Sequence, residues 1–217
     1  AASDVYKRQG GTSNSTRGLF SGGDGSPDIN VIDFITMDTL GNGTDFGNLT
    51  VARRNHGNHS ASPTRAVFTG GQTPTAQNVI DFVEFATTGN AADFGDLTAA
   101  TGSLSSCGSS TRGVTAAGYT SGAVKTAQYI TIASQGNATD FGDLTVARYG
   151  AAASSNSVKG LWGGGNTVPA YSNVMDILSI STLGNGVDFG NLSETRGNLG
   201  GASNGHGGLN DGYQGYG

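Results

Sequence analysis

The chain has 217 residues, among them 38 glycines, and only 12% of its residues are charged. Its net charge of −5 gives no electrostatic basis for binding nucleic acid, whose phosphates attract basic surfaces. No apolar run approaches the roughly 18 residues that a membrane-spanning helix needs, so we expect no membrane insertion. The lone cysteine, Cys107, cannot form an internal disulfide, and we expect it to be a small buried side chain.

Two terminal stretches stand apart from the rest of the chain. Residues 1–9 (AASDVYKRQ) have no apolar core of the kind found in a signal peptide, and we interpret them as a non-repeat leader or an artefact. Residues 213–217 consist mostly of glycine and tyrosine and are expected to be a flexible tail. Residues 10–212, which lie between them, carry an internal repeat.

Two landmarks in this region recur with the same period. A Thr-Arg pair opens the units at Thr16, Thr64 and Thr111, and Val158-Lys159 replaces it in the fourth unit. The motif Asp-Phe-Gly-(Asp/Asn)-Leu recurs 47 or 48 residues apart, at Asp45, Asp93, Asp140 and Asp188. Because two independent landmarks keep one period, each unit is expected to be one repeated supersecondary structure.

Each unit divides into four expected strands. An apolar run closed by two glycines, such as 17–23, precedes a loop that differs in every unit. Next come a run rich in β-branched and aromatic residues such as 31–36, an Asn-Gly turn, and a short strand anchored by Phe46 or its counterpart. The unit ends in a small, polar segment that suits a strand at a crowded centre. Since no window shows a helical period, the sequence predicts an all-β fold.

Four strands in a period of 47–48 residues are typical of a β-propeller blade. We place four blades at approximately 10–49, 50–97, 98–144 and 145–192, and a partial fifth blade at 193–212. Four blades can close as a small propeller. Because the repeat starts and stops inside a unit, we expect a piece of a larger ring instead, with further blades of the same chain among its partners.

The order of these features resembles the kelch repeat. The matching residues are Leu19-Phe-Ser-Gly-Gly, Ile32-Asp-Phe, Phe46 where kelch usually has Trp, and Arg53. Arg148 and Arg196 match in later units, whereas the third unit has Thr101. The resemblance covers roughly residues 10–212 and implies four-stranded, kelch-like blades that begin with the innermost strand.

A second likeness concerns the wording of the repeat. The pattern NVIDFIT…GNxTDFGDLTVAR is similar to repeats in predicted tail or structural proteins of marine bacteriophages. This likeness implies a virion or extracellular location.

A candidate binding face follows from the blade topology. The loop after the glycine pair and the connection into the next blade lie on the same face of such a blade, and variable loops on a constant scaffold are where propellers bind. The expected ligand-binding residues are Arg53, Arg148, Arg196, Asp24, Asp28, Tyr119, Trp162 and Tyr171. The aromatic rings would stack on sugars and the aspartates would accept hydrogen bonds. The alternative is that the arginines bridge blades and the aromatic residues serve packing.

No catalytic residue, metal or cofactor is expected. His56 and His59 are three residues apart, which on a strand puts them on opposite faces and argues against joint metal ligation. Asp33, Asp81 and Asp176 lie in the middle of expected strands, and we expect them to bind backbone or the repeat's arginine. A phosphate-cradling Gly-x-x-x-x-Gly-Lys-Ser/Thr motif is absent.

These observations favour a non-enzymatic binding or structural propeller. The setting we expect is a phage tail fibre or another virion-associated protein that recognises a glycan or protein on the host surface. Two alternatives remain: a carbohydrate-active enzyme on a propeller scaffold, and an intracellular kelch-type interaction adaptor. The sialidase box Ser-x-Asp-x-Gly-x-x-Trp, which would favour the enzyme, is absent.

Overall fold

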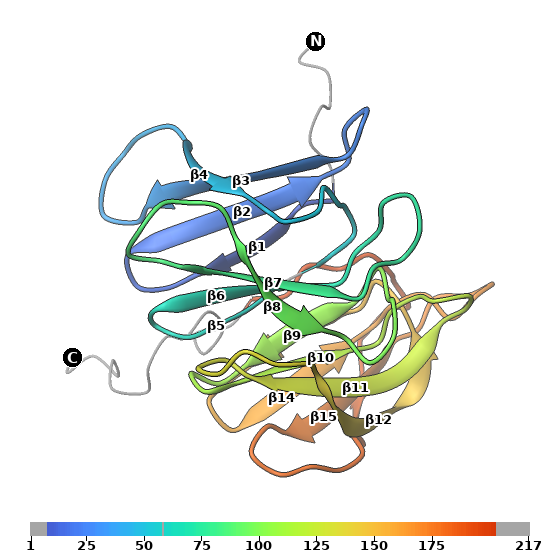
Figure 1. Cartoon of the computed structure of the whole chain (residues 1–217). Coiled ribbons are helices and arrows are strands. Elements are labelled where there is room, and N and C mark those ends of the chain that lie inside the picture. Colours follow the sequence, from blue (N-terminus) through green and yellow to red (C-terminus); the bar gives the residue numbers. More distant parts are fainter. Residues whose placement is uncertain (1–7, 58, 203–217) are drawn as a thin grey trace.

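The computed structural model of the chain describes residues 8–57 and 59–202 (Figure 1). All regular elements in these ranges are β-strands, and they form four separate sheets. Within the described residues, no helix is long and apolar enough to cross a membrane. The prediction of an all-β propeller with four four-stranded blades is confirmed.

Each blade is an antiparallel meander of four consecutive strands. Blade 1 contains β1 (Gly10–Ser13), β2 (Arg17–Gly23), β3 (Ile29–Thr36) and β4 (Thr44–Asn48). Blade 2 contains β5 (Ser60–Ala61), β6 (Arg65–Thr69), β7 (Val79–Glu84) and β8 (Ala92–Asp96). Blade 3 contains β9 (Ser105–Gly108), β10 (Arg112–Ala116), β11 (Val124–Thr131) and β12 (Thr139–Arg148). Blade 4 contains β13 (Ala152–Ser155), β14 (Lys159–Gly163), β15 (Val174–Ser179) and β16 (Val187–Asn191).

The expected partial fifth blade is not shown by the structure. Residues 193–202 contain no strand, and residues 203–212 lie outside the described residues. The expected flexible tail at 213–217 and most of the expected leader, residues 1–7, also lie outside them. Contacts between neighbouring blades run mainly through the first strand of each blade, as expected for the innermost strand.

A bulge recurs at one position in every blade. The register between the third and fourth strands shifts after Ile32, Ile80, Ala127 and Met175. In blade 1, Ile32 lies opposite Gly47, whose φ of 148° falls in a region that favours glycine. A bulge redirects the side chain that follows it. In blades 2 and 4 the following residue is Asp81 or Asp176, and its carboxylate meets the preceding blade.

The hydrophobic core is divided among the junctions between blades. At the first junction, Phe46 of blade 1 packs with Phe68 and Phe85 of blade 2, and all three are at most 2% exposed. Phe94 anchors the second junction and Phe141 the third, where Cys107 is also buried as expected. Each blade is therefore stabilised by burying apolar area against its neighbours, since one sheet alone cannot cover both of its faces.

Backbone contacts fix how each blade meets the next one. The amide of the turn glycine in one blade donates to the carbonyl of the anchoring phenylalanine in the blade before it. These hydrogen bonds are Gly89 N to Phe46 O (2.7 Å), Gly136 N to Phe94 O (2.8 Å) and Gly184 N to Phe141 O (2.9 Å). A Cβ on Gly47 would collide with the carbonyl oxygen of Gly89, so a glycine is required at this close approach.

Candidate binding site at the mouth of the channel

The connections between blades lie beside the variable loops. Isolated β-bridges join Arg54 to Gln72, Gly102 to Tyr119, and Tyr149 to Asn166. In each pair the first residue belongs to a connection and the second to the loop of the following blade. The expectation that these two segments share one face is confirmed.

Five equivalent positions, spaced 47 or 48 residues apart, adopt the same unusual backbone conformation. Arg8, Asn55, Ser103, Gly150 and Asn198 have φ angles between 52° and 60°, in the left-handed region. Backbone hydrogen bonds link the first four in order: Asn55 N to Arg8 O (3.1 Å), Ser103 N to Asn55 O (2.7 Å) and Gly150 N to Ser103 O (2.8 Å). At the fifth position the next residue makes the bond, from Leu199 N to Gly150 O (3.3 Å). Non-glycine residues in this region cost energy, and such residues concentrate at functional sites.

These positions surround a pocket of about 590 Å³. Its polar lining includes Arg8, Asn55, Ser103, Tyr149 and Asn198, and its apolar lining includes Leu104 and Leu199. The volume lies within the range of about 300–1,000 Å³ that is typical of small-molecule sites. Among the described residues that line the pocket, none carries a carboxylate, an imidazole or a thiol.

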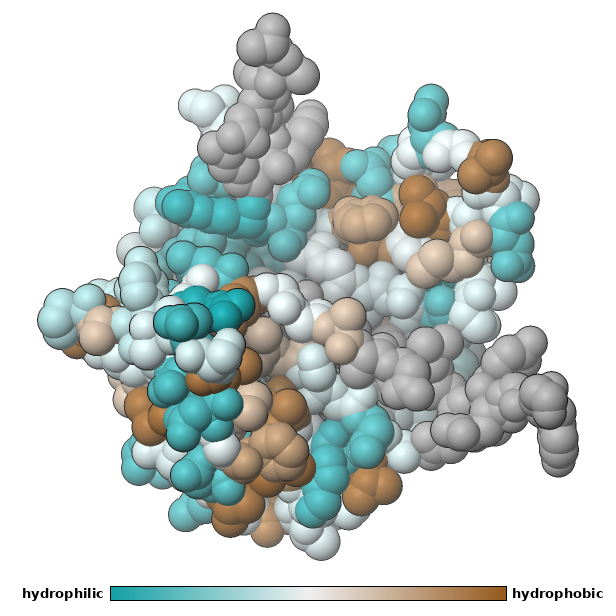
Figure 2. Space-filling model, turned by 180° about the vertical axis from the view of Figure 1, so that it is seen from behind, coloured by the Kyte–Doolittle hydropathy of each residue, from teal (hydrophilic) through white to brown (hydrophobic). Residues whose placement is uncertain are grey.

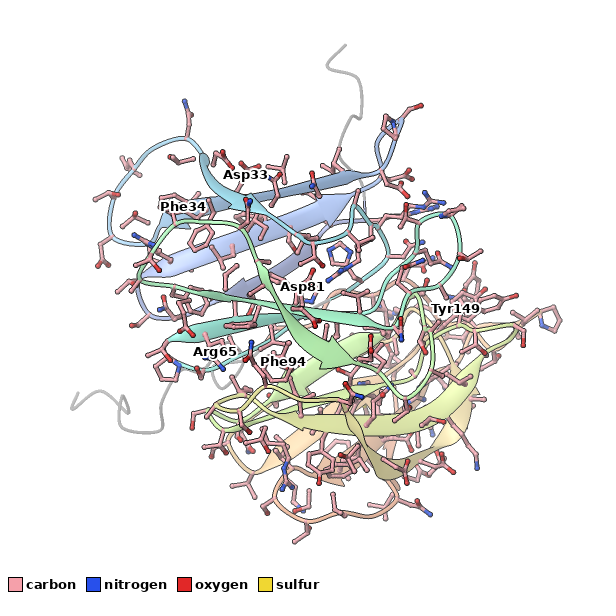
Figure 3. All side chains as sticks on the ribbon, viewed as in Figure 1. Asp33, Phe34, Arg65, Asp81, Phe94 and Tyr149 are labelled. Carbon is pink, nitrogen blue, oxygen red and sulfur yellow. The ribbon has the colours of Figure 1, made fainter. Side chains whose placement is uncertain are left out.

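Tyrosine side chains mark the border between this pocket and the loops. Tyr149 lines the pocket and lies edge-on to Tyr119, with ring centroids 5.2 Å apart. Figure 3 shows Tyr149 beside the loops that connect the second and third strands. Tyr171, in the loop of blade 4, has 54% of its surface exposed, so its ring is open to solvent. The predicted residues Tyr119 and Tyr171 thus lie on the face that carries the variable loops.

Two ion pairs lie on the same face in blade 1. Arg8 contacts Asp24 at 3.6 Å, and both side chains are partly exposed. Arg54 contacts Asp28 at 2.6 Å, and the Asp28 side chain is only 7% exposed. Asp24 therefore remains accessible to a ligand, whereas Asp28 is largely covered by its own partner.

Two of the predicted arginines are buried inside the protein. Arg53 pairs with Asp81 at 2.9 Å and Arg148 with Asp176 at 2.6 Å, and all four side chains are completely buried. Burial lowers the pKa of both guanidinium groups, and the neighbouring carboxylate opposes this shift. The expectation that the mid-strand aspartates bind backbone or the repeat's arginine is confirmed for Asp81 and Asp176, whereas the Asp33 side chain binds neither among the described residues. Arg53 and Arg148 offer no accessible atom to a ligand, because they connect neighbouring blades.

Trp162 and Arg196 have different surroundings. Trp162 is fully buried between blades 3 and 4, where its Nε1 donates to Ser105 O at 3.2 Å, so stacking on a sugar is excluded in this structure. Arg196 is exposed, and its side chain makes no hydrogen bond or ion pair with any described residue. It occupies the repeat position of Arg53 and Arg148, but no aspartate of a following blade lies among the described residues to pair with it.

The histidines correct one argument made from the sequence. His56 and His59 do not point to opposite sides: their rings are stacked at 5.0 Å, and both Nε2 atoms lie 3.3 Å from Ser21 Oγ. They lie outside any strand, and the left-handed φ angles of Asn55 and Gly57 break the alternation on which that argument depends. Burial first, and then the charge of Arg53, lower the pKa of His56 to about 3. The described residues contain no group of three or more ligands suited to a metal ion.

None of the predicted site residues lines the pocket. Four residues that do line it lie two positions after the repeat's arginine position, at Asn55, Ser103, Gly150 and Asn198. The constant spacing of these four positions could have indicated that they are equivalent in the fold. The residue types gave no further signal, because small polar residues in a connection are also expected for an ordinary loop.

Comparison with known proteins supports the fold. No family model matches the chain, and no curated protein is similar enough to match it. The solved structure titled "Structure of YjhT" aligns with a TM-score of 0.75 at 10% sequence identity, and the match covers 90% of this chain and 68% of that chain. At this identity the likeness shows the fold alone. The described residues thus fold as four blades of a β-propeller.

Proposed function

We propose that the protein is a non-enzymatic binding propeller that takes a surface glycan at the mouth of its channel. The observation that carries the proposal is the pocket of about 590 Å³, formed where repeated left-handed positions meet the variable loops. This arrangement suits recognition, because the repeated backbone conformation fixes the position of the site while the variable loops beside it set its specificity.

The chemistry of the lining fits a polyhydroxylated ligand. Asn55 and Asn198 carry both donors and acceptors, Ser103 offers a hydroxyl, and Tyr149 presents a ring together with a phenol. An aromatic ring with a polar tip suits a sugar, which has both apolar and hydroxyl-bearing faces. The Arg8 guanidinium, whose side chain is 56% exposed, adds a partner for an acidic sugar.

The same lining supports binding rather than turnover at this pocket. Hydrolysis of a glycosidic bond typically uses two carboxylates on either side of that bond. The described lining residues include no aspartate, glutamate or histidine. The phage tail fibre or virion setting is part of our proposal. It rests on the similarity of the repeat's amino-acid pattern to repeats in predicted phage tail or structural proteins.

The test is a glycan array on the full chain, followed by calorimetry with the best glycan. We expect Tyr149→Ala and Asn198→Ala each to weaken binding about tenfold or more, which corresponds to about 1.4 kcal/mol. Leu40→Ala is the matched control. Leu40 is a fully exposed side chain in the turn between β3 and β4, which lies at the opposite end of the blade, and binding should be unchanged.

Three results would contradict the proposal. They are an array with no signal above background, a Tyr149→Ala variant that binds like the wild type, and a Leu40→Ala variant that loses binding equally. Turnover of model glycosides by the wild type would instead favour the enzyme alternative. Circular dichroism of each variant checks that its fold is unchanged.

A further inference from the structure

Charged residues follow one rule at the first and third junctions. The arginine near the end of one blade pairs with the mid-strand aspartate of the next, as in Arg53–Asp81 and Arg148–Asp176. A threonine three residues before the arginine donates to the same carboxylate, at 2.5 Å from Thr145 Oγ1 to Asp176. A blade that ends with this arginine therefore fits a blade that offers this aspartate.

The two outermost blades each have one unpaired half of this junction. Asp33 is the counterpart of Asp81 in blade 1, and Arg196 is the counterpart of Arg148 in blade 4. The Asp33 carboxylate and the Arg196 guanidinium make no hydrogen bond or ion pair with any described residue. Figure 3 shows Asp81 among the strands of blades 1 and 2, and Asp33 on the side of blade 1 that faces away from blade 2.

The apolar residues of the two outer faces are uncovered in the same way. Phe189 of blade 4 is 56% exposed, whereas its counterparts Phe46, Phe94 and Phe141 are 2–3% exposed. Phe20 of blade 1 is 44% exposed, whereas its counterparts Phe68 and Trp162 are fully buried. Figure 2, seen from behind, shows apolar side chains gathered over the lower part of the molecule, where Figure 1 places the last two blades.

We name these surfaces by their residues. The first face belongs to blade 1 and consists of Phe20, Asp33, Ile35 and Met37. The last face belongs to blade 4 and consists of Leu161, Met175, Phe189, Leu192 and Arg196. Each residue of the two faces is the repeat counterpart of residues that are buried or paired at the internal junctions. Only the second junction lacks the charged pair, because Thr101 and Gln128 stand there in place of the arginine and the aspartate.

We propose that two copies of this chain associate head to tail, with the last face of one copy covering the first face of another. Arg196 of one copy then pairs with Asp33 of the next, and Phe189 packs against Met37 as Phe46 packs near Phe85. The contact is heterologous, since different surfaces meet. It closes into a ring where the rotation permits and otherwise extends to further copies.

Residues 199–202 must move for this contact to form. They lie against blade 4, where the next blade would place its innermost strand, with Leu199 N bonded to Gly150 O (3.3 Å) and Ser154 Oγ to Ala202 O (3.2 Å). In blade 1 the corresponding place is taken by Gly10–Ser13, which is paired with β2 at four positions. A docked copy would bring this strand, already paired within its own blade, to the place that residues 199–202 occupy.

The experiment measures mass by sedimentation velocity and light scattering over a wide range of protein concentration at physiological salt. We expect the wild type to rise from 21.7 kDa to a multiple of that mass. Arg196→Asp and Asp33→Arg should each weaken association about tenfold or more, because each places like charges opposite one another. The double variant Arg196→Asp/Asp33→Arg should regain association, because it reverses the pair.

Lys125→Glu is the matched control. It makes the same change in charge as Arg196→Asp, but at an exposed pair with Asp143 in blade 3, and association should be unchanged. The proposal is overturned by a wild type that stays monomeric throughout, by a double variant as monomeric as the single variants, or by a control that loses association equally. Glycan binding is measured by array and calorimetry and association is measured by mass, so failure of either proposal leaves the other one testable.

Discussion

The buried pair Arg148–Asp176 allows a sharp test of what joins the blades. Arg148 Nη2 lies 2.6 Å from the Asp176 carboxylate, and the guanidinium also donates to Val174 O (2.9 Å) and Trp162 O (3.1 Å). Arg148→Thr leaves the Asp176 carboxylate buried without its counter-charge. Removing one partner of a buried ion pair costs about 3–5 kcal/mol of unfolding free energy.

The chain itself contains the compensating change. At the second junction Thr101 stands in place of the arginine and Gln128 in place of the aspartate. Gln128 Oε1 accepts from Thr98 N (2.8 Å) and Thr98 Oγ1 (3.0 Å), so the polar contact survives without charge. We therefore expect the double variant Arg148→Thr/Asp176→Gln to recover most of the loss. About 1–2 kcal/mol should remain, from the unpaired carbonyls and the smaller side chain.

The assay is urea denaturation followed by the fluorescence of Trp162. This residue is the chain's single tryptophan and is fully buried at the same junction. The change in midpoint at constant slope gives the change in unfolding free energy. Two results would refute the reasoning: a single variant within about 1 kcal/mol of the wild type, which is the ordinary effect of a point mutation, or a double variant no more stable than the single one.

Three further predictions use the same denaturation assay or a thiol probe. Phe141→Ala should lose about 3–5 kcal/mol of stability, whereas Phe189→Ala at the equivalent position should lose less than about 0.5 kcal/mol in the monomer; equal losses would contradict our assignment of the core to the junctions. Because the folded protein holds the pKa of His56 near 3 instead of 6.5, the unfolded state binds the extra proton and stability should fall as pH drops through this interval, by at most ~1.4 kcal/mol per pH unit. His56→Gln should flatten that slope, and an unchanged slope would exclude His56 as its source. Burial raises the pKa of Cys107 to about 12, so thiol reagents at mild alkaline pH should label it only as fast as the protein opens, and immediate labelling would show that the thiol is accessible.

The architecture was predictable because it is encoded redundantly. Phe46, Phe94 and Phe141 keep one spacing, and each is buried at a junction, so a pattern in the sequence corresponds directly to a packing rule. The mid-strand position of Asp81 likewise predicted its arginine partner. Repetition made these inferences secure, since one physical cause acts several times along the chain.

The candidate site was less predictable for two physical reasons. The exposure of a side chain depends on which faces of the blades become covered. From the sequence, Arg148, Trp162 and Tyr171 were equally good candidates for binding, but of these three only Tyr171 reaches solvent. Backbone conformation also redirects side chains. The left-handed residue Asn55 brings His56 to the same side as His59, and no local residue type required that conformation.

The dependence of each blade on its neighbours has a consequence for how the molecule fluctuates. Within the described chain, blades 2 and 3 pack against a neighbouring blade on both sides, whereas blades 1 and 4 each pack against a neighbour on one side. In a linear array whose stability is a sum of nearest-neighbour terms, opening starts at the ends and proceeds inward. Amide protons of β3 and β15 should thus exchange with solvent sooner than those of β7 and β11. A further copy docked on an end would convert that end into an interior and slow its exchange.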